Sequence, residues 1–376
     1  MARDYPSVPA RVGGSRHTLT GARTSITLCG NVATHPVTGD RQRGGGVEMI
    51  GIGVVGYWHV HANDYALEAL GHPRTRLVTG YDPDQALARK GALARGIEPA
   101  ADLDALLTNP EVDAVTITTA TSDHTEMIRR AIRAGKHVFA EKLLAPTVGE
   151  CEALIQEADA AGVELVVSLP RLTESPILAA RALIDSGELG TVTYARVRMA
   201  HDGWLAGWLP ERFADRVTAI GGAFADLGCH PAYLIQHMLG SAPVTLTATY
   251  GSVSAHAVED NAVVVAGYAD GAVGVAEASF VTTPGAFAFE LRGTRASLLY
   301  GFGQEKLTAK GGRFGEQTWS EIELPDAGPR PFDLWIDAIE GRADASANRA
   351  AATELTRFVV AANESARTGR TINYQA

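Results

Sequence analysis

The chain has 376 residues, 46% of them hydrophobic and 20% charged, and this composition excludes wholesale disorder. Lys and Arg total 33 against 43 acidic residues, so the net charge of -10 repels nucleic-acid phosphates, and no apolar run approaches the roughly 18 residues that span a bilayer. We therefore expect neither nucleic acid nor a membrane as a partner. The three cysteines are widely spaced and form no CxxC pair, which favours a reducing, cytoplasmic location.

The length exceeds what one hydrophobic core comfortably fills, so two folded domains are expected. Residues 1–47 stand apart because they are rich in Gly, Arg, Thr and Ser and show neither helical nor strand periodicity. We predict that they form a disordered extension without a catalytic role. They contain no signal-peptide apolar core, and Met49 directly precedes the first apolar run. A translation start placed too far upstream and a flexible arm are the two interpretations.

From Met49 onward, short apolar runs alternate with helical stretches. Strands are predicted at 49–55, 76–81, 114–119, 137–140 and 163–168, and helices at 62–70, 83–95, 124–134 and 147–161. Gly71 and Gly135 suit the left-handed position just past a helix end, and Thr147 with Glu150 forms an N-terminal capping box. Strand-helix alternation at this pitch predicts a doubly wound parallel sheet, and so a Rossmann domain, over residues 48–170.

The pattern changes after Pro170. A helix is predicted at 175–186, strands at 192–199, 244–250, 262–268, 272–279, 287–291 and 296–300, and a closing helix at 348–367. From 244 the strands follow one another without helices, and residues 269–271 read as a hairpin turn. We therefore predict an α/β chain whose C-terminal domain, residues 171–376, is α+β with a large, mostly antiparallel open sheet.

The first strand is followed by a candidate nucleotide-binding turn. Gly51, Gly53 and Gly56 spell GxGxxG, but in that register no strand precedes the motif. The register that fits ends the strand at residue 55 and starts the turn at Gly56, with Trp58 and His61 in place of the second and third glycines. A strand-to-helix turn that binds nothing is the alternative.

Asp82 follows the second predicted strand, 26 residues after Gly56. A carboxylate at this place can accept hydrogen bonds from both adenosine ribose hydroxyls and repels a 2′-phosphate, which favours NAD over NADP. The alternative is that Asp82 only caps the next helix.

Several separated motifs resemble the glucose-fructose oxidoreductase / inositol dehydrogenase (Gfo/Idh/MocA) family over residues 49 to about 373. In chain order they read TTATSDH at 118–124, AGKHVFAEK at 134–142, DSGELG at 185–190, GGAFADLGCH at 221–230 and SARTGR at 365–370. The family usually reads A-T-P-N-x-x-H and A-G-K-H-V-x-x-E-K-P at the first two. Here Ala120 and Leu143 replace the two prolines, the second of which belongs to a tight, often cis, backbone that aims the lysine.

The resemblance implies an NAD-dependent enzyme and assigns roles to the matching residues. The turn of Gly56, Tyr57 and Trp58 would hold the pyrophosphate and Asp82 the ribose. Other cofactor contacts would come from Thr119, His124, Glu141 and Lys142. Lys142 would also stabilise the developing alkoxide, and Asp226 would bind a substrate hydroxyl or orient an imidazole.

Asp226 and His230 are four residues apart, so on a helix they would share one face. Oxidation of a secondary alcohol requires a base, and the pKa of histidine suits that role, so we predict Lys142, Asp226 and His230 as the catalytic residues with His230 as the base. Pro231 predicts that His230 lies at a kink or a helix junction. We expect no metal, because there is no HExxH motif and no third ligand at a suitable spacing; His59 and His61 should pack near the cofactor.

The sequence therefore predicts an NAD(P)-dependent oxidoreductase that acts on a hydroxyl or keto group of a sugar, inositol or related polyol, with NAD as the cofactor in preference to NADP. The resemblance also implies a homo-dimer or homo-tetramer. Two alternatives stay open at this point. One is an NAD-dependent lyase-type glycosidase that uses the same residues, and the other is a catalytically silent dinucleotide sensor.

Overall fold

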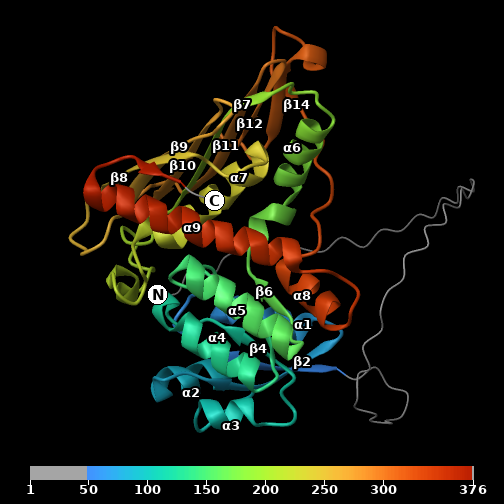
Figure 1. Ribbon diagram of the computed structural model, residues 1–376, viewed down its shortest axis with the longest axis vertical. Helices are drawn as coiled ribbons and strands as arrows, with labels where there is room; N and C mark the ends of the chain where they lie inside the picture. The colour runs from blue at the N-terminus through green and yellow to red at the C-terminus, as the bar shows by residue number, and fades with distance from the viewer. Residues whose placement is uncertain (1–48, 375–376) are drawn as a thin grey trace, which may run out of the picture. The chain divides into compact units, whose positions relative to one another are not determined.

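Two β-sheets, built from successive halves of the chain, carry the fold (Figure 1). The computed structural model describes residues 49–374, so the extension predicted at 1–47 lies outside the described residues. As predicted, the first sheet is parallel and the second is mostly antiparallel.

The first sheet has six strands in the order β3-β2-β1-β4-β5-β6. Its strands are β1 (Ile50–Val55), β2 (Thr75–Tyr81), β3 (Glu98–Pro99), β4 (Ala114–Ile117), β5 (His137–Ala140) and β6 (Leu165–Val167). The order changes direction between β1 and β4, and in parallel sheets ligands bind beyond the carboxyl ends of strands at such a point. The nucleotide turn follows β1, and Lys142 follows β5, at this same edge.

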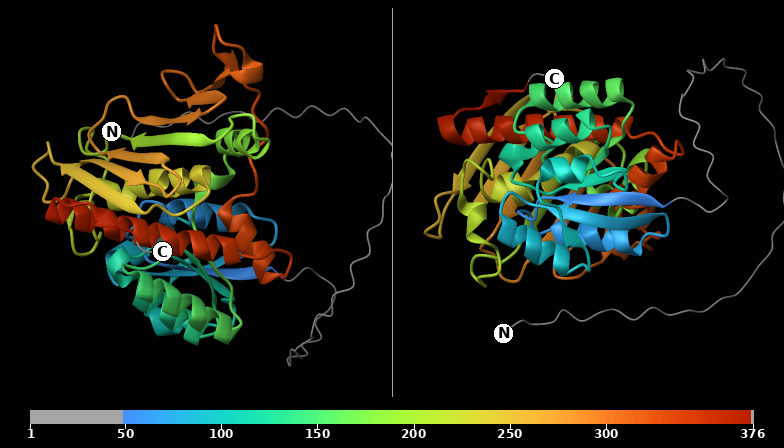
Figure 2. Two further views of the ribbon diagram at one scale, coloured as in Figure 1. Left: turned by 45° about the horizontal axis from the view of Figure 1, so that its top comes forward. Right: turned by 90° about the horizontal axis from the view of Figure 1, so that it is seen from below.

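Helices cover both faces of this sheet (Figure 2). They are α1 (Ala62–Gly71), α2 (Gln85–Leu93), α3 (Leu103–Leu107), α4 (His124–Arg133) and α5 (Val148–Ala161). Two predicted helix ends are confirmed. Gly135, just after α4, has a φ of 70°, and Thr147 caps the start of α5, where its hydroxyl accepts from the Glu150 amide. The expectation for Gly71 is wrong: it is the last residue of α1, and the extended residue His72 closes the helix by donating its amide to Glu68.

Within residues 49–374 the second sheet has nine strands in the order β14-β13-β12-β11-β7-β10-β9-β8-β15, and of its pairs only β7–β10 is parallel. Its strands are β7 (Val192–Ala200), β8 (Thr245–Gly251), β9 (Asn261–Gly267), β10 (Val273–Ser279), β11 (Ala286–Gly293), β12 (Ala296–Tyr300), β13 (Leu307–Gly311), β14 (Ser320–Glu321) and β15 (Ile372–Asn373). The helices of this half are α6 (Ser175–Asp185), α7 (Cys229–Leu239), α8 (Pro331–Ile339) and α9 (Ser346–Thr368). Helix α7 packs on β7 and β10, and α9 packs on β8.

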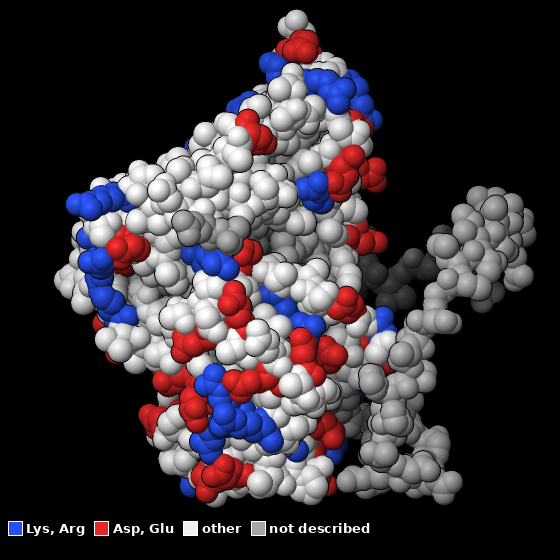
Figure 3. Space-filling model, in the orientation of Figure 1, with Lys and Arg blue, Asp and Glu red and all other residues white. Residues whose placement is uncertain are grey.

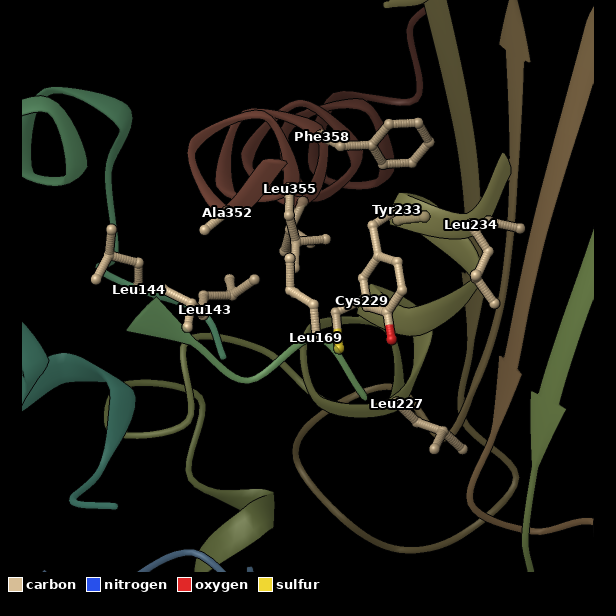
Figure 4. Packing of buried hydrophobic residues seen from close by; sticks show 14 of the residues in the cluster. Leu143, Leu144, Leu169, Leu227, Cys229, Tyr233, Leu234, Ala352, Leu355 and Phe358 are labelled. Atoms are coloured by element: carbon tan, nitrogen blue, oxygen red, sulfur yellow. The ribbon is translucent and has the colours of Figure 1, made fainter. Parts of the chain in front are cut away.

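One continuous core joins the two halves. Helix α9 packs against α5 of the first half and against β8 and α7 of the second. Figure 4 shows Leu143, which directly follows Lys142, in the same cluster as Leu355 of α9 and Cys229 and Tyr233 of α7. All four side chains are buried. This packing fixes the end of β5 against the start of α7, which is where the predicted catalytic residues lie.

None of the helices within residues 49–374 combines the length and the apolarity needed to cross a membrane. On the face shown in Figure 3, basic and acidic side chains are interspersed over the lower part of the molecule rather than gathered in a patch of one sign.

Candidate active site

The nucleotide turn begins where β1 ends. Gly51 and Gly53 lie inside β1, so the register that starts the turn at Gly56 is confirmed. Gly56 has a φ of 93°, and its amide donates to the carbonyl of Tyr81 at 2.7 Å. A Cβ at this position would lie 2.5 Å from the amide nitrogen of Thr119. Only glycine therefore fits, because both the backbone conformation and the approach of β4 exclude a side chain.

Asp82 ties the end of β2 to this turn. Its carboxylate accepts from the Tyr57 amide at 2.5 Å and from the Asp84 amide at 2.8 Å, and the residue is only 4% exposed. The side chain that caps α2 is Asp84, not Asp82, so the interpretation of Asp82 as a mere helix cap is wrong. Burial raises the pKa of Tyr57 to about 12, and its ring packs against Gly91 of α2.

Trp58, which replaces the second glycine of the motif, contacts the segment Glu211–Ala214 from the second half. Its carbonyl accepts from Arg212 Nε at 2.5 Å, and its indole lies 4.8 Å from the ring of Phe213. The turn is thus bridged to the second half by a backbone hydrogen bond and by a ring contact, and a glycine at position 58 would lose the ring contact.

The end of β4 closes the other side of the turn. The Thr118 hydroxyl donates to the carbonyl of Gly56 at 2.5 Å, and the hydroxyl of Thr119 is buried without a partner among the described residues. His124 is fully buried, and its Nδ1 lies 2.7 Å from the carbonyl of Leu143. Burial lowers the pKa of His124, which favours the neutral ring. Its hydrogen bond to the Leu143 carbonyl supports the backbone that follows Lys142.

Lys142 lies at the centre of a buried charge cluster. Its ammonium is 2.6 Å from both Asp226 Oδ1 and the Asp226 carbonyl, and 3.6 Å from Glu141 Oε1. Burial alone would lower the pKa of Lys142, but the Asp226 carboxylate, together with other nearby groups, raises it above its usual value. Burial alone would raise the pKa of Asp226, but the charge of Lys142 and the hydrogen bonds from His59 and Lys142 together hold it well below its usual value. The Lys142–Leu143 peptide bond is cis, as the resemblance implies despite the leucine.

Asp226 and His230 are each hydrogen-bonded to another side chain, so the base-and-partner arrangement is not formed within the described residues. Residues Phe224–Gly228 form a π-helical turn and α7 begins at Cys229, so Asp226 and His230 lie in two successive helical segments, and both side chains line the same cavity. The buried Glu259 accepts from the Phe224 amide and so supports the start of this turn. The histidine partner of Asp226 is His59, whose Nε2 lies 3.1 Å from Oδ1. The helix junction that Pro231 predicted at His230 is present.

His230 is paired with Tyr233 instead. The Tyr233 hydroxyl lies 2.9 Å from His230 Nδ1 and accepts from the Arg171 amide at 3.2 Å. A buried hydroxyl proton without an acceptor costs about 1–3 kcal/mol, so the favoured arrangement has Tyr233 donating to Nδ1, with the proton of the neutral imidazole on Nε2. Burial, and after it the charges of Lys142 and Arg171, hold the pKa of His230 well below its usual value.

These groups line a cavity of about 550 Å³. Lys142, Asp226 and His230 form part of its wall, together with His59 from the nucleotide turn. The remaining wall is partly aromatic and partly charged, and includes Arg171, Glu174, His201, Trp208 and Phe287. The cavity therefore offers charged hydrogen-bonding groups on one side and flat apolar faces on another, an arrangement suited to a small polyhydroxylated molecule.

His59, His61 and Glu141 come together closely enough to hold a metal ion, with all candidate ligand atoms within 4.8 Å. Two features argue against such a site. His59 Nε2 faces the Asp226 carboxylate, and the Lys142 ammonium already lies 3.6 Å from Glu141 Oε1. A second cation beside this ammonium would be repelled. The expectation of no metal stays a prediction.

Two family models match the chain and together cover more than half of it. Residues 46–169 match an oxidoreductase family described as having an NAD-binding Rossmann fold, and residues 177–299 match the GFO/IDH/MocA C-terminal domain. The chain belongs to the Gfo/Idh/MocA oxidoreductase family. This membership confirms the resemblance and the fold class predicted from the sequence.

Several proteins resemble this chain over most or part of its length. Scyllo-inositol 2-dehydrogenase (NAD(+)) of Bacillus subtilis (strain 168) is 29% identical over 278 residues, which cover 71% of this chain and 78% of that protein. Inositol 2-dehydrogenase of Rhizobium meliloti (strain 1021) is 31% identical over 204 residues, 54% of this chain and 57% of that protein. The crystal structure of GenD2 from gentamicin A biosynthesis, in complex with NAD, is 26% identical with a TM-score of 0.74, and the match covers 90% of this chain and all of that one.

Proposed function

We propose that this chain catalyses the NAD-linked interconversion of a hydroxyl and a keto group on a sugar, inositol or related polyol. The observation that carries the proposal is the cluster of Lys142 and Asp226 in the wall of a cavity that also reaches the nucleotide turn through His59. Relatives named as inositol dehydrogenases support the substrate class. We propose residues 48–170 as the cofactor domain and 171–376 as the substrate domain.

The residues around Gly56 fit a dinucleotide. Glycine at 56 lets the turn approach Thr119 so closely that a Cβ would lie 2.5 Å from its amide nitrogen, and the buried Thr119 hydroxyl lacks a partner among the described residues. The turn of Gly56, Tyr57 and Trp58 would hold the pyrophosphate, and the Asp82 carboxylate, with lone pairs to spare, would accept from the ribose. The Asp82 charge supports NAD over NADP. When bound, the cofactor accepts or returns the hydride at its nicotinamide.

Lys142 is the proposed proton donor to the substrate oxygen. Its ammonium is held by Asp226 and stays charged at neutral pH, so it stabilises a developing alkoxide and protonates it during carbonyl reduction. In the oxidation direction the neutral amine of Lys142 accepts the hydroxyl proton. Glu141, 3.6 Å from Lys142 Nζ, adds a second negative charge that keeps the ammonium in place, whereas His124 and Thr119 act on the backbone and the turn.

His230 has a different proposed role from the base that its pattern suggests. With Tyr233 donating to Nδ1, the neutral imidazole presents Nε2–H to the cavity and can donate a hydrogen bond to a substrate oxygen. Asp226 can accept from a neighbouring substrate hydroxyl. The two side chains together hold a diol by one donor and one acceptor.

Turnover of a substrate panel tests the proposal. Inositols, aldoses and ketoses are incubated with NAD or NADP in either redox state, and the absorbance of the reduced nicotinamide is followed. We expect NAD-linked turnover of at least one polyol or its ketone, lost in Lys142→Met. Cleavage of nitrophenyl glycosides without net cofactor change would replace the proposal with the lyase-type reaction, and dinucleotide binding without any turnover would indicate a sensor.

The predicted homo-dimer or homo-tetramer also stays a proposal. Its support is the face of the second sheet turned away from α7, where Val263 and Val265 of β9 are each 42% exposed. Light scattering of the purified chain measures the oligomeric state.

A further inference from the structure

His59 connects the nucleotide turn to the reaction centre. Its amide donates to the Thr118 carbonyl at 3.0 Å, which holds the backbone of the turn against β4. Its side chain is 5% exposed and extends to Asp226, 167 positions along the chain, with 3.1 Å between Nε2 and Oδ1. One residue therefore touches the predicted cofactor turn with its backbone and the proposed reaction centre with its imidazole.

The hydrogen bonds of the His59 ring fix its tautomer. Nδ1 accepts from the His61 amide at 3.2 Å, so it carries no proton. In the neutral ring the proton is then on Nε2, and it points at the Asp226 carboxylate. Burial lowers the pKa of His59, although the charges of Glu141 and Asp226 oppose this and Lys142 reinforces it. The neutral ring is thus a fixed hydrogen-bond donor rather than a second cation beside Lys142.

We propose that His59 is a positioning residue, which holds Asp226 by its Nε2–H and so couples the nucleotide turn to the orientation of Lys142. The proposal rests on the proposed function. Asp226 Oδ1 receives both His59 Nε2 and Lys142 Nζ, at 3.1 and 2.6 Å. If His59 is displaced, this carboxylate loses the neutral donor that fixes its rotation, and the ammonium that it binds loses a fixed direction. A dinucleotide bound at the turn would act on His59 through the backbone, which the His59 amide ties to the Thr118 carbonyl.

Two amide substitutions separate this role from simple packing. Glutamine places its amide nitrogen where the imidazole has Nε2, whereas asparagine places it where the imidazole has Nδ1, out of reach of Asp226. His59→Asn should lower kcat by about 10- to 100-fold, the value of one hydrogen bond to a charged group, with little change in KM. His59→Gln should stay within about threefold of the parent chain. Equal losses in both variants, or losses in KM alone, would overturn the proposal.

Nitrogen NMR of the imidazoles tests the same claim without turnover. In the full chain without cofactor, the His59 signals, identified by their absence in His59→Gln, should report a neutral ring protonated on Nε2 at pH 7. Addition of NAD should shift the Nε2–H signal. A ring protonated on Nδ1, or on both nitrogens, would contradict the assignment. Failure of NAD to bind at all would instead contradict the proposed function, while the tautomer would still be read from the cofactor-free spectrum.

Discussion

Asp226→Asn should destabilise the folded chain strongly, because it leaves the Lys142 ammonium buried without its main counter-charge. The Lys142 side chain is 3% exposed and that of Asp226 18%. Removing one partner of a buried ion pair typically costs about 3–5 kcal/mol. The lower end applies here, about 3 kcal/mol, because the Asp226 carbonyl at 2.6 Å and Glu141 at 3.6 Å still face the ammonium.

The pH dependence of this loss has a definite sign. The folded-state pKa of Asp226 is lowered, so its stabilising contribution is present above the unfolded pKa of about 3.9 and is lost as the pH falls through the folded pKa. The folded-state pKa of Lys142 is raised, so its contribution is present below about 10.4 and is lost as the pH rises through the folded pKa. The difference between the parent chain and Asp226→Asn should therefore be constant between about pH 5 and 10, and smaller below about pH 4.

Urea unfolding of both proteins at pH 7 and at pH 3 measures the difference as a shift in midpoint at constant slope. The double variant Lys142→Met with Asp226→Leu is the control, because removing both charges from a buried pair is often close to neutral. We expect the free energy of unfolding of the double variant to lie within about 1 kcal/mol of that of the parent chain. An Asp226→Asn variant as stable as the parent chain, or a double variant as unstable as the single one, would show that the buried Lys142 charge does not depend on Asp226.

Three further predictions concern the cofactor and the proton. Gly56→Val should weaken NAD binding at least about tenfold in calorimetry, because its Cβ would meet Thr119 at 2.5 Å and strain the backbone; unchanged affinity would exclude this turn as the pyrophosphate site. Asp82→Ser should raise the affinity ratio of NADP to NAD in fluorescence titration, since it removes the charge that repels a 2′-phosphate, and an unchanged ratio would remove Asp82 from cofactor selection. The rate of oxidation should rise with pH through the alkaline range as Lys142 loses its proton; a profile that rises only below neutral pH and then stays flat would restore His230 as the base.

Local patterns in the sequence were sufficient to predict most strands and helices of the first half of the chain. Alternating strands and helices predicted the parallel sheet, and the position of Gly56 after a strand selected the correct glycine register. Helix α8 was missed although Pro331 at its first position and Asp333 in its first turn are typical start signals. Strands such as β14 were missed because two residues carry no periodicity.

The reaction centre depended on contacts that no local pattern reports. Asp226 and His230 were paired because their spacing fits an α-helix, but Asp226 lies in a π-helical turn and His230 at the start of α7, and each is bonded to another side chain. That turn is stabilised by Glu259, a residue distant in the sequence, so its presence had no local signal. His59, the partner of Asp226, lies 167 positions away in the sequence, whereas Tyr233, the partner of His230, lies three positions away. Only the His230–Tyr233 pair is close enough in sequence for a local pattern to have suggested it.

Calorimetric titration of the purified chain with NAD and with NADP measures the cofactor binding on which the proposed reaction depends. We predict saturable binding of NAD, weaker binding of NADP, and retention of NAD binding in Lys142→Met, since that residue acts on the substrate oxygen. Absence of binding by either dinucleotide at millimolar concentration would contradict the proposed reaction.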